Sequence, residues 1–326
     1  MPRVTVLGSV NMDISVTVAE LPGPGATVLG GAARFTPGGK GANQAVAAAR
    51  LGASVRMVGC VGQDDFGQQL VEALTAEGID TAAVAVLDGV PSGLAMITVD
   101  AAGENMITVA PGANREVSHA QVGDADVLVI SAEIPLAVVR QALSQQALGR
   151  QQKALGEHQI VVLNLAPAPP EADAAEIVGH GVDWLVVNET EAAAVLGTQV
   201  HGLDGARQAA AGLVAAGALN AVVTAGSHGA ALASATEGAV AVPGFPVTAV
   251  DSVGAGDTFV GALAVALAAG VPPRDAVTAA SAAAAAKVTR HGAQAGMPRP
   301  VDILAVTGIT WPVDGEGEYI VNSGRT

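Results

Sequence analysis

Short apolar runs rich in Val, Ile and Leu recur along the chain, and segments with helical patterns lie between several of them. Because such strands are apolar on both faces, they predict a mostly parallel sheet that helices cover on both sides. The predicted fold class is therefore α/β. The predicted helices include residues 42–51, 64–77 and 204–216, and the predicted strands are VTVLGS (4–9), SVRMVG (54–59), DVLVIS (126–131), IVVLN (160–164), DWLVVN (183–188) and AVVTAG (221–226).

Two regions interrupt this alternation. Residues 14–36 and 92–109 have the pattern of extended or hairpin segments, with DAAGEN (100–105) as a turn. We expect them to form a small β-sheet that covers a site as a lid. The predicted division is a core of residues 1–13, 37–91 and 110–310, a lid of residues 14–36 and 92–109, and a C-terminal tail of residues 311–326.

Charge and composition exclude several function classes. A formal net charge of −15 and an aromatic content of 2% argue against nucleic-acid binding, because polyanions are repelled and few side chains could stack on bases. The single cysteine, Cys60, excludes an intramolecular disulfide framework and is typical of a reducing compartment. The N-terminus lacks a signal-peptide pattern, and GVPPRD (270–275) divides the alanine-rich stretch 258–286 into two helices rather than one membrane span. We expect a cytoplasmic protein that binds a small molecule but neither nucleic acid nor a membrane.

The common catalytic motifs are absent from the sequence. There is no GxxxxGK[ST] phosphate loop, no HExxH zinc motif and no GxSxG nucleophile turn. The six histidines are scattered, which argues against a metal cluster built on them. The segment GGKGANQ (38–44) lacks the third glycine of a nicotinamide-binding fingerprint and does not follow the first strand.

The segment DSVGAGDTFVGALAVALAAG (251–270) places two glycines and an aspartate directly before a long alanine-rich helix. The turn Gly254-Ala255-Gly256 exposes backbone N–H groups at the positive end of the helix dipole, which together favour an anion. Asp257 would oppose that anion unless its carboxylate has a separate task. The alternative is an ordinary aspartate in the first turn of a helix.

Two further groups of polar residues carry candidate chemistry. NMD (11–13) and GGKGANQ (38–44) offer a carboxylate, an amide and a lysine that suit sugar hydroxyls; alternatively they are an Asx turn and a loop that enters a helix. VNETE (187–191) offers an amide and carboxylates that suit magnesium held through water; alternatively Asn188 caps a helix and Glu189 and Glu191 favour its dipole. Combined with the anion turn, these groups suit phosphoryl transfer to an alcohol, with Asp257 as the base.

Eight motifs carry a resemblance to a known family. They are GSVNMD, GGKGANQAVAAARLGA, GENMITVAPGAN, LNLAPAP, NETEA, TAGSHG, DSVGAGDTFVGAL and AAAKVTRHGAQ, and they span about residues 3–305 in the family's order. In these motifs the chain resembles the ribokinase family of phosphofructokinase-B-type carbohydrate kinases. The resemblance implies a three-layer α/β/α sandwich with a mostly parallel sheet, a small β-sheet lid that forms a homodimer contact, and ATP-dependent phosphorylation of D-ribose at the 5-hydroxyl.

The resemblance also assigns roles to residues. It implies Asp257 as general base and Gly254, Ala255 and Gly256 as the anion hole. The implied sugar-binding residues are Asn11, Met12, Asp13, Gly39, Lys40, Gly41, Ala42, Asn43, Glu133 and Asp257. The implied ATP-binding residues are Asn188, Thr224, Ala225, Gly226, Ser227, His228, Gly229, Gly256, Asp257 and Ser281.

Two metal ions are implied in the same way. Glu191 is the expected magnesium residue, acting through water. A monovalent cation, potassium, is expected behind the anion hole, where it would fix the turn so that its N–H groups point forward. The implied potassium ligands are the Asp251 side chain and backbone oxygens near Val253, Lys287, Arg290, Gly292 and Gly296.

The chain departs from the family pattern at four places. His228 stands where an arginine is expected, Gly296 stands where a serine is expected, residues 144–158 form a longer surface helix and loop, and the tail has no counterpart. None of these touches the sugar residues. Other acceptors within the family (deoxyribose, a ketohexose or a nucleoside) stay open, although the few aromatic residues disfavour a nucleoside. A non-catalytic sugar-binding protein is the remaining alternative, and the intact GAGD and NETE segments argue against it.

Overall fold

The computed structural model describes residues 1–118, 122–152, 159–236 and 238–313, with the backbone alone for 149–152. Its centre is a nine-stranded sheet of order β13-β12-β11-β10-β9-β8-β1-β4-β5. The strands from β11 to β5 are parallel, and β12 and β13 add an antiparallel edge. The strands of this sheet are β1 (Arg3–Leu7), β4 (Ser54–Gly62), β5 (Asp80–Leu87), β8 (Val127–Ser131), β9 (Ile160–Asn164), β10 (Trp184–Asn188), β11 (Asn220–Thr224), β12 (Gly229–Ser234) and β13 (Gly238–Pro243).

Helices cover both faces of this sheet, which confirms the predicted three-layer α/β/α sandwich. Strand β8 shows the alternation: Val127 and Val129 belong to one buried cluster, and Leu128 and Ile130 belong to the other. The first cluster includes α1 (Lys40–Arg50), α2 (Asp65–Ala76), α7 (Ala255–Ala268), α8 (Pro273–Val288) and α10 (Pro300–Thr307). The second includes α3 (Leu136–Gln152), α4 (Glu171–Gly179), α5 (Glu189–Leu196) and α6 (Gly202–Ala215).

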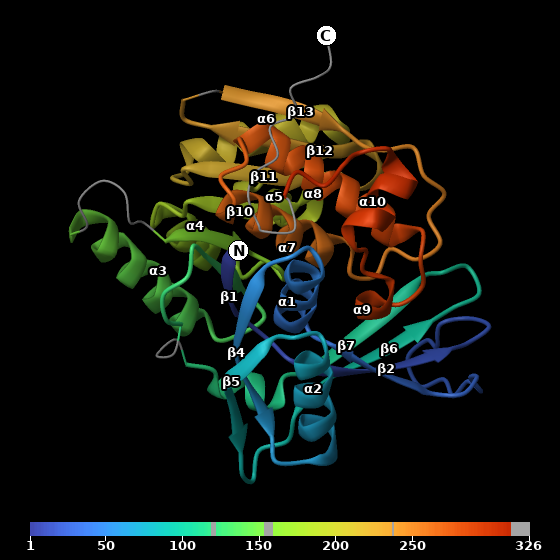
Figure 1. Ribbon diagram of the computed structural model, residues 1–326. Helices are drawn as coiled ribbons and strands as arrows, with labels where there is room; N and C mark the ends of the chain where they lie inside the picture. The colour runs from blue at the N-terminus through green and yellow to red at the C-terminus, as the bar shows by residue number, and fades with distance from the viewer. Residues whose placement is uncertain (119–121, 153–158, 237, 314–326) are drawn as a thin grey trace.

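A second, four-stranded sheet of order β3-β2-β6-β7 extends to one side of the core (Figure 1). Its hairpin turn at Asp100 is closed by the Asp100 N–H, which donates to the Glu104 carbonyl at 2.9 Å. Strand β2, which comes first along the chain, begins at Asn11, so the NMD segment is part of this sheet and not a turn after β1. The strands are β2 (Asn11–Thr17), β3 (Arg34–Gly38), β6 (Gly93–Val99) and β7 (Asn105–Ala110).

The alanine-rich C-terminal stretch forms two helices, as predicted. Helix α7 ends at Ala268, and α8 begins at Pro273, a residue suited to a first helical position. No helix in the described ranges combines the length and the apolar character that a bilayer crossing requires.

Two segments predicted as additions to the fold are partly described. Helix α3 continues to Gln152, so residues 144–152 are helical as expected, and residues 153–158 lie outside the described residues. Residues 314–326 of the tail also lie outside them. The start of the tail packs against the core, because Trp311 is buried and its indole N–H donates to the Leu51 carbonyl at 3.2 Å. Short helices at η1 (Gly112–Glu116), η2 (Gly226–His228) and α9 (Ala293–Gly296) complete the chain.

Candidate active site

Asp257 lies in the first turn of α7, and only 9% of the residue is exposed. Both of its carboxylate oxygens accept hydrogen bonds from α1. Oδ2 accepts from Asn43 Nδ2 at 2.9 Å, and Oδ1 accepts from Gln44 Nε2 at 3.1 Å. Two amide donors from one rigid helix fix the orientation of this carboxylate, as a proton acceptor requires.

Helices α1 and α7 meet closely because small residues face each other at their contact. A Cβ atom on Gly261 would lie 2.7 Å from the Ala47 Cβ and 2.7 Å from the Gln44 carbonyl oxygen. Such a distance is too short for any side chain larger than hydrogen. The glycine therefore sets the separation across which α1 reaches Asp257.

Gln44 is a site residue that sequence reasoning missed. Its Nε2 also donates to Asn164 Oδ1 at 2.9 Å, and Asn164 Nδ2 donates to the Val186 carbonyl at 3.2 Å. The chain of amides ties the Asp257 carboxylate to the ends of β9 and β10. The sequence did offer an indication, because Gln44 stands in the motif GGKGANQ directly after the predicted site residue Asn43.

Asn43 was expected to bind a sugar, and in the structure it contacts protein groups. Its Nδ2 donates to Asp257, while its Oδ1 accepts from Gln294 Nε2 at 3.1 Å. Two other expected sugar residues have buried structural positions: Met12 and Ala42 are each 1% exposed within the core. Their side chains therefore do not line the site.

A second polar cluster surrounds Glu133, which follows β8. Its Oε2 accepts from the Ser9 hydroxyl in a short hydrogen bond, from Asn11 Nδ2 at 3.3 Å and from the Lys40 backbone N–H at 3.4 Å. Asn114 holds Asn11 in turn, since its Nδ2 donates to Asn11 Oδ1 at 2.7 Å. Ser9 and Asn114 were missed, although both stand in quoted motifs, GSVNMD and APGAN.

Asp13, on β2, adds a second carboxylate that is electrostatically coupled to Glu133. Burial, together with the negative charges of Glu133 and Asp257, raises the pKa of Asp13 to about 7, although the Lys40 charge opposes the shift. Gly38 on the neighbouring strand makes room for this carboxylate, because a Cβ there would lie 2.1 Å from Asp13 Oδ2. A carboxylate oxygen pair in this position can accept hydrogen bonds from neighbouring hydroxyls of a sugar.

Lys40 supplies positive charge among these acidic groups. Burial lowers its pKa, but the surrounding carboxylates outweigh that effect and leave the pKa above its ordinary value. Burial also raises the pKa of Glu191. Lys40 begins α1 directly after Gly39, whose φ of 89° brings the chain into the helix. The carboxylates whose charges raise the pKa of Lys40 are those of Asp257, Glu133, Glu191 and Asp13.

The turn before α7 has the geometry of an anion site. Gly254 adopts the left-handed conformation with φ of 77°. The Ala255 N–H donates to the Ser252 carbonyl at 3.1 Å, so it is less available than expected. The N–H groups of Gly256 and Asp257 lie in the first helical turn, where no preceding turn of α7 supplies a carbonyl. These two groups are the donors best placed for a phosphate.

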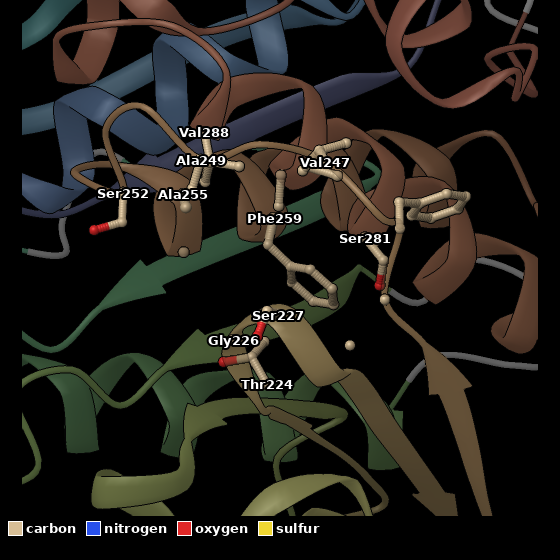
Figure 2. A pocket seen from close by; sticks show the side chains of 16 residues that line it. Thr224, Gly226, Ser227, Val247, Ala249, Ser252, Ala255, Phe259, Ser281 and Val288 are labelled. Atoms are coloured by element: carbon tan, nitrogen blue, oxygen red, sulfur yellow. The ribbon is translucent and has the colours of Figure 1, made fainter.

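A pocket borders this turn, since Ala255 and Gly256 are among its lining residues (Figure 2). The Phe259 ring and the Ser281 hydroxyl point toward the Gly226–Ser227 turn. The Ser281 Oγ is buried and has no hydrogen-bond partner within the described part of the chain, which suits a polar ligand atom. The predicted nucleotide residues that line the pocket are Thr224, Gly226, Ser227, Gly229, Gly256 and Ser281.

Two predicted nucleotide residues of the segment 224–229, Ala225 and His228, do not line the pocket. Ala225 is buried in the core, and the His228 ring contacts the Ala225 carbonyl at 3.2 Å. The pocket has an apolar wall that sequence reasoning missed because the residues lie in an irregular segment without a motif. Its members include Gly244, Phe245, Val247 and Ala249.

Comparison with known proteins places this geometry in a family. The model of the pfkB family carbohydrate kinases matches residues 1–300. The chain belongs to the pfkB family of carbohydrate kinases. The match confirms the family that the order of the eight motifs predicted.

Individual members of the family are similar to this chain along most of its length. A ribokinase from Bacillus subtilis is 38% identical over 299 residues, which covers 91% of this chain and 97% of that protein. A ribokinase from Haemophilus influenzae is 36% identical over 307 residues, covering 92% and 96%. A structure of the Arabidopsis thaliana ribokinase complexed with ribose and ATP has a TM-score of 0.82 and 29% identity, and covers 95% of this chain and 99% of that one.

In this pfkB family kinase, Asn188 and Glu191 form a capping box at the start of α5. The Asn188 N–H donates to Glu191 Oε2 at 2.8 Å, and the Glu191 N–H donates to Asn188 Oδ1 at 2.8 Å. The helix-cap alternative is therefore realised. In the described parts of the chain, no three His, Cys, Asp or Glu side chains converge as a metal site. A single carboxylate, that of Glu191, fits a Mg²⁺ ion that keeps several waters and phosphate ligands.

The expected potassium position of this pfkB family kinase contains a lysine. Lys287 Nζ donates to the Asp251 carbonyl at 2.8 Å and to the Arg290 carbonyl at 3.5 Å, and lies 3.8 Å from Asp251 Oδ1. The Asp251 carboxylate accepts instead from the Val253 N–H at 2.9 Å and the Gly292 N–H at 2.7 Å. Two of the oxygens expected to hold potassium, the Arg290 carbonyl and Asp251 Oδ1, thus already face a positive charge, so the residues do not fit that ion.

Proposed function

We propose that this chain transfers the γ-phosphoryl group of ATP to the 5-hydroxyl of D-ribose, producing ribose 5-phosphate and ADP. The observation that carries the proposal is the position of Asp257. Its carboxylate is held by α1 on the side of the Asp13 and Glu133 cluster, and its helix begins at the turn that borders the apolar pocket. An alcohol on one side and a triphosphate on the other would meet at this residue.

The chemical step follows from that placement. The Asp257 carboxylate accepts the proton of the attacking hydroxyl as the hydroxyl oxygen bonds to the γ-phosphorus. The bond from the γ-phosphorus to the bridging oxygen breaks, and its electron pair leaves with ADP. The N–H groups of Gly256 and Asp257 and the α7 dipole stabilise the negative charge on the transferring group.

The polar cluster supplies the sugar site in this proposal. The carboxylates of Asp13 and Glu133 and the charge of Lys40 act on one another, and the Asn11 amide donates to Glu133. Each carboxylate accepts from hydroxyls on neighbouring sugar carbons, and this pairing fixes the rotation of the ring. The 5-hydroxyl then lies toward Asp257.

We propose that Mg²⁺ accompanies ATP and is held through water by Glu191. The ion neutralises phosphate charge when bound. Glu191 uses one oxygen for the capping bond to Asn188, and the charges of Lys40 and Asp257 act on its carboxylate, which supports this role. Burial raises the pKa of Glu191. A divalent cation nearby would counter that effect, because a positive charge favours the ionised carboxylate.

A coupled ADP assay with a panel of acceptors tests the proposal. We expect D-ribose to give the highest kcat/KM, ahead of 2-deoxyribose, a ketohexose and a nucleoside. Asp257→Asn keeps the size of the side chain and should lower kcat by roughly 10²–10⁴-fold with little change in the ribose KM. A deoxyribose or nucleoside preference would overturn the acceptor, and full activity of Asp257→Asn would overturn the mechanism.

We also propose that the four-stranded sheet mediates a homodimer. Its exposed apolar side chains favour burial against a second copy. Phe35 stacks on Phe66 of α2 at 6.0 Å, so the face that carries it is partly covered within one chain. The opposite face, with Asp13, carries Ile107 at 53% and Val109 at 40% exposure. This second face is the proposed contact.

A further inference from the structure

Lys287 is a lysine with 0% exposure at the end of an alanine-rich helix. Its described neighbours around Nζ are acceptors: the carbonyls of Asp251 and Arg290 and the Asp251 carboxylate. An ammonium group has three N–H donors and no lone pair, so this set of oxygens matches its charged form. Burial lowers the pKa of Lys287, and the negative charge of Asp251 counters that effect.

Nζ lies beside two of the oxygens expected to hold a monovalent cation, the Arg290 carbonyl at 3.5 Å and Asp251 Oδ1 at 3.8 Å, and it donates to a third oxygen, the Asp251 carbonyl. Carbonyl oxygens and one carboxylate around a single positive charge are the environment that such an ion would need. Here the charge is covalently attached to α8. The 2.8 Å contact to the Asp251 carbonyl is the length of a charge-assisted hydrogen bond.

Gly296 gives independent evidence that the Lys287 side chain occupies this position. A Cβ at position 296 would lie 3.2 Å from the Lys287 Cε and 3.1 Å from the carbonyl oxygens of Arg290 and His291. The serine expected at this position would therefore crowd the lysine stem. The glycine at position 296, one of the departures from the family pattern, leaves the space that the lysine stem occupies.

The lysine is connected to the anion turn through Asp251. The Val250 and Asp251 N–H groups both donate to the Val288 carbonyl, at 2.7 and 3.1 Å, while Lys287 holds the Asp251 carbonyl. The loop that follows α8 packs on the turn itself, since a Cβ on Gly254 would lie 3.2 Å from the Ala293 Cα. The ammonium thus joins two loops behind the phosphate-binding N–H groups.

We propose that the Lys287 ammonium replaces the monovalent cation, so that the Gly254–Gly256 turn keeps its phosphate-binding shape without potassium. Lys287 is a positioning residue, because it acts on the turn through the Asp251 and Arg290 carbonyls. The statement that the turn binds phosphate rests on the proposed function. The cation position can be tested without catalysis.

The unaltered protein provides the first measurement. After exchange into choline buffer, addition of potassium at constant ionic strength should change neither its Tm nor its ADP affinity by calorimetry. Crystals soaked in rubidium should show no anomalous scattering beside Asp251. A Tm or affinity that rises with potassium, or rubidium bound there, would overturn the proposal whether or not the chain phosphorylates ribose.

Two variants separate charge from volume. Lys287→Ala suits the alanine-rich helix and opens room for an ion, whereas Lys287→Met fills the volume without charge. In choline buffer both should lose about 10-fold to 10³-fold in kcat/KM for ATP, as when an oxyanion donor is misplaced. Potassium should restore Lys287→Ala alone and raise the Tm of that variant by a few degrees.

Position 296 and the start of α8 supply the remaining variants. Adding Gly296→Ser to Lys287→Ala should strengthen the potassium response, because a hydroxyl oxygen joins the vacated position. Arg274→Ala removes an exposed charge from the same helix and should show no potassium response. If potassium and rubidium leave Lys287→Ala unaffected in Tm and scattering, no cation position exists there and the proposal fails.

Discussion

At the scale of single residues, the site depends on side chains whose charge or pairing is set by burial. Asp13 and Lys40 have pKa values above their ordinary ranges for opposite reasons: burial dominates for the carboxyl, and neighbouring carboxylates dominate for the amine. Ser281 shows the same principle for a neutral group, since its buried hydroxyl has no partner in the described chain. Each of these features gives a prediction.

The raised pKa of Asp13 predicts a pH dependence of sugar capture. Below about pH 7 the carboxyl of the free enzyme is protonated and loses acceptor capacity, so kcat/KM for ribose should fall by up to about tenfold per pH unit. Above about pH 7, kcat/KM for ribose should not change with pH. Steady-state kinetics from pH 5 to 9 measure the profile, with Asp13→Asn as a control of low activity and no such inflection. An inflection near the ordinary Asp pKa would contradict the assignment.

Ser281→Ala should weaken nucleotide binding. Loss of one hydrogen bond to the nucleotide corresponds to about 0.5–1.5 kcal/mol, which is a rise of roughly 2–13-fold in the KM for ATP. The ribose KM should stay constant. Ser131→Ala is the matched control, because Ser131 Oγ is also buried without a described partner but does not line the nucleotide pocket. An equal effect of both substitutions would refute the role of Ser281.

At the scale of elements, the decisive contact is the crossing of α1 and α7. One helix carries Asn43 and Gln44, the other carries Asp257, and Gly261 lets them approach. The position of Asp257, the proposed base, is therefore a property of helix packing. A change remote from the reacting atoms should alter it.

Gly261→Ala should separate the two helices. The added methyl group overlaps Ala47 and the Gln44 carbonyl, so we expect a loss of about 1–3 kcal/mol in the free energy of unfolding and a lower kcat. Urea denaturation and steady-state kinetics measure both. Gly205→Ala in α6 is the control, since its Cβ would approach other atoms no closer than 3.6 Å; helix propensity predicts a neutral or slightly stabilising change there.

At the scale of the whole molecule, the four-stranded sheet is the part that the core does not cover. Its apolar side chains occupy both faces, because residues alternate along β7 between the face of Asp13 and the face that packs toward α2. The face with Ile107 therefore exposes two large apolar side chains, those of Ile107 and Val109, to a second copy.

Ile107→Lys should convert a dimer into a monomer at micromolar concentration, because a charge at the centre of the contact would be buried without a partner. Sedimentation velocity measures the change. Met106→Lys places the same charge on the neighbouring residue, whose side chain lies on the opposite face, and should leave the dimer intact. Dissociation by Met106→Lys alone would show that the other face forms the contact.

Much of the fold followed from local sequence. The strands at Val4 and Val127 and the helices around Gly254 and Pro273 were predictable, because periodicity, glycine and proline act over a few residues. The candidate site residues were predicted from short motifs and from the order of those motifs along the chain. The partners Ser9, Gln44 and Asn114 were not, because each requires knowing which way a side chain points.

By itself, the sequence determined the α/β class, the extra sheet, the family and the residues at the strand ends, all of which depend on short-range patterns and motif order. Only the tertiary structure decided which groups meet: Asp257 with Asn43 across 214 positions, and the Lys287 ammonium with the Asp251 carbonyl across 36. The physical reason is that a hydrogen bond or ion pair depends on ångström distances between elements, and chain order alone does not specify them.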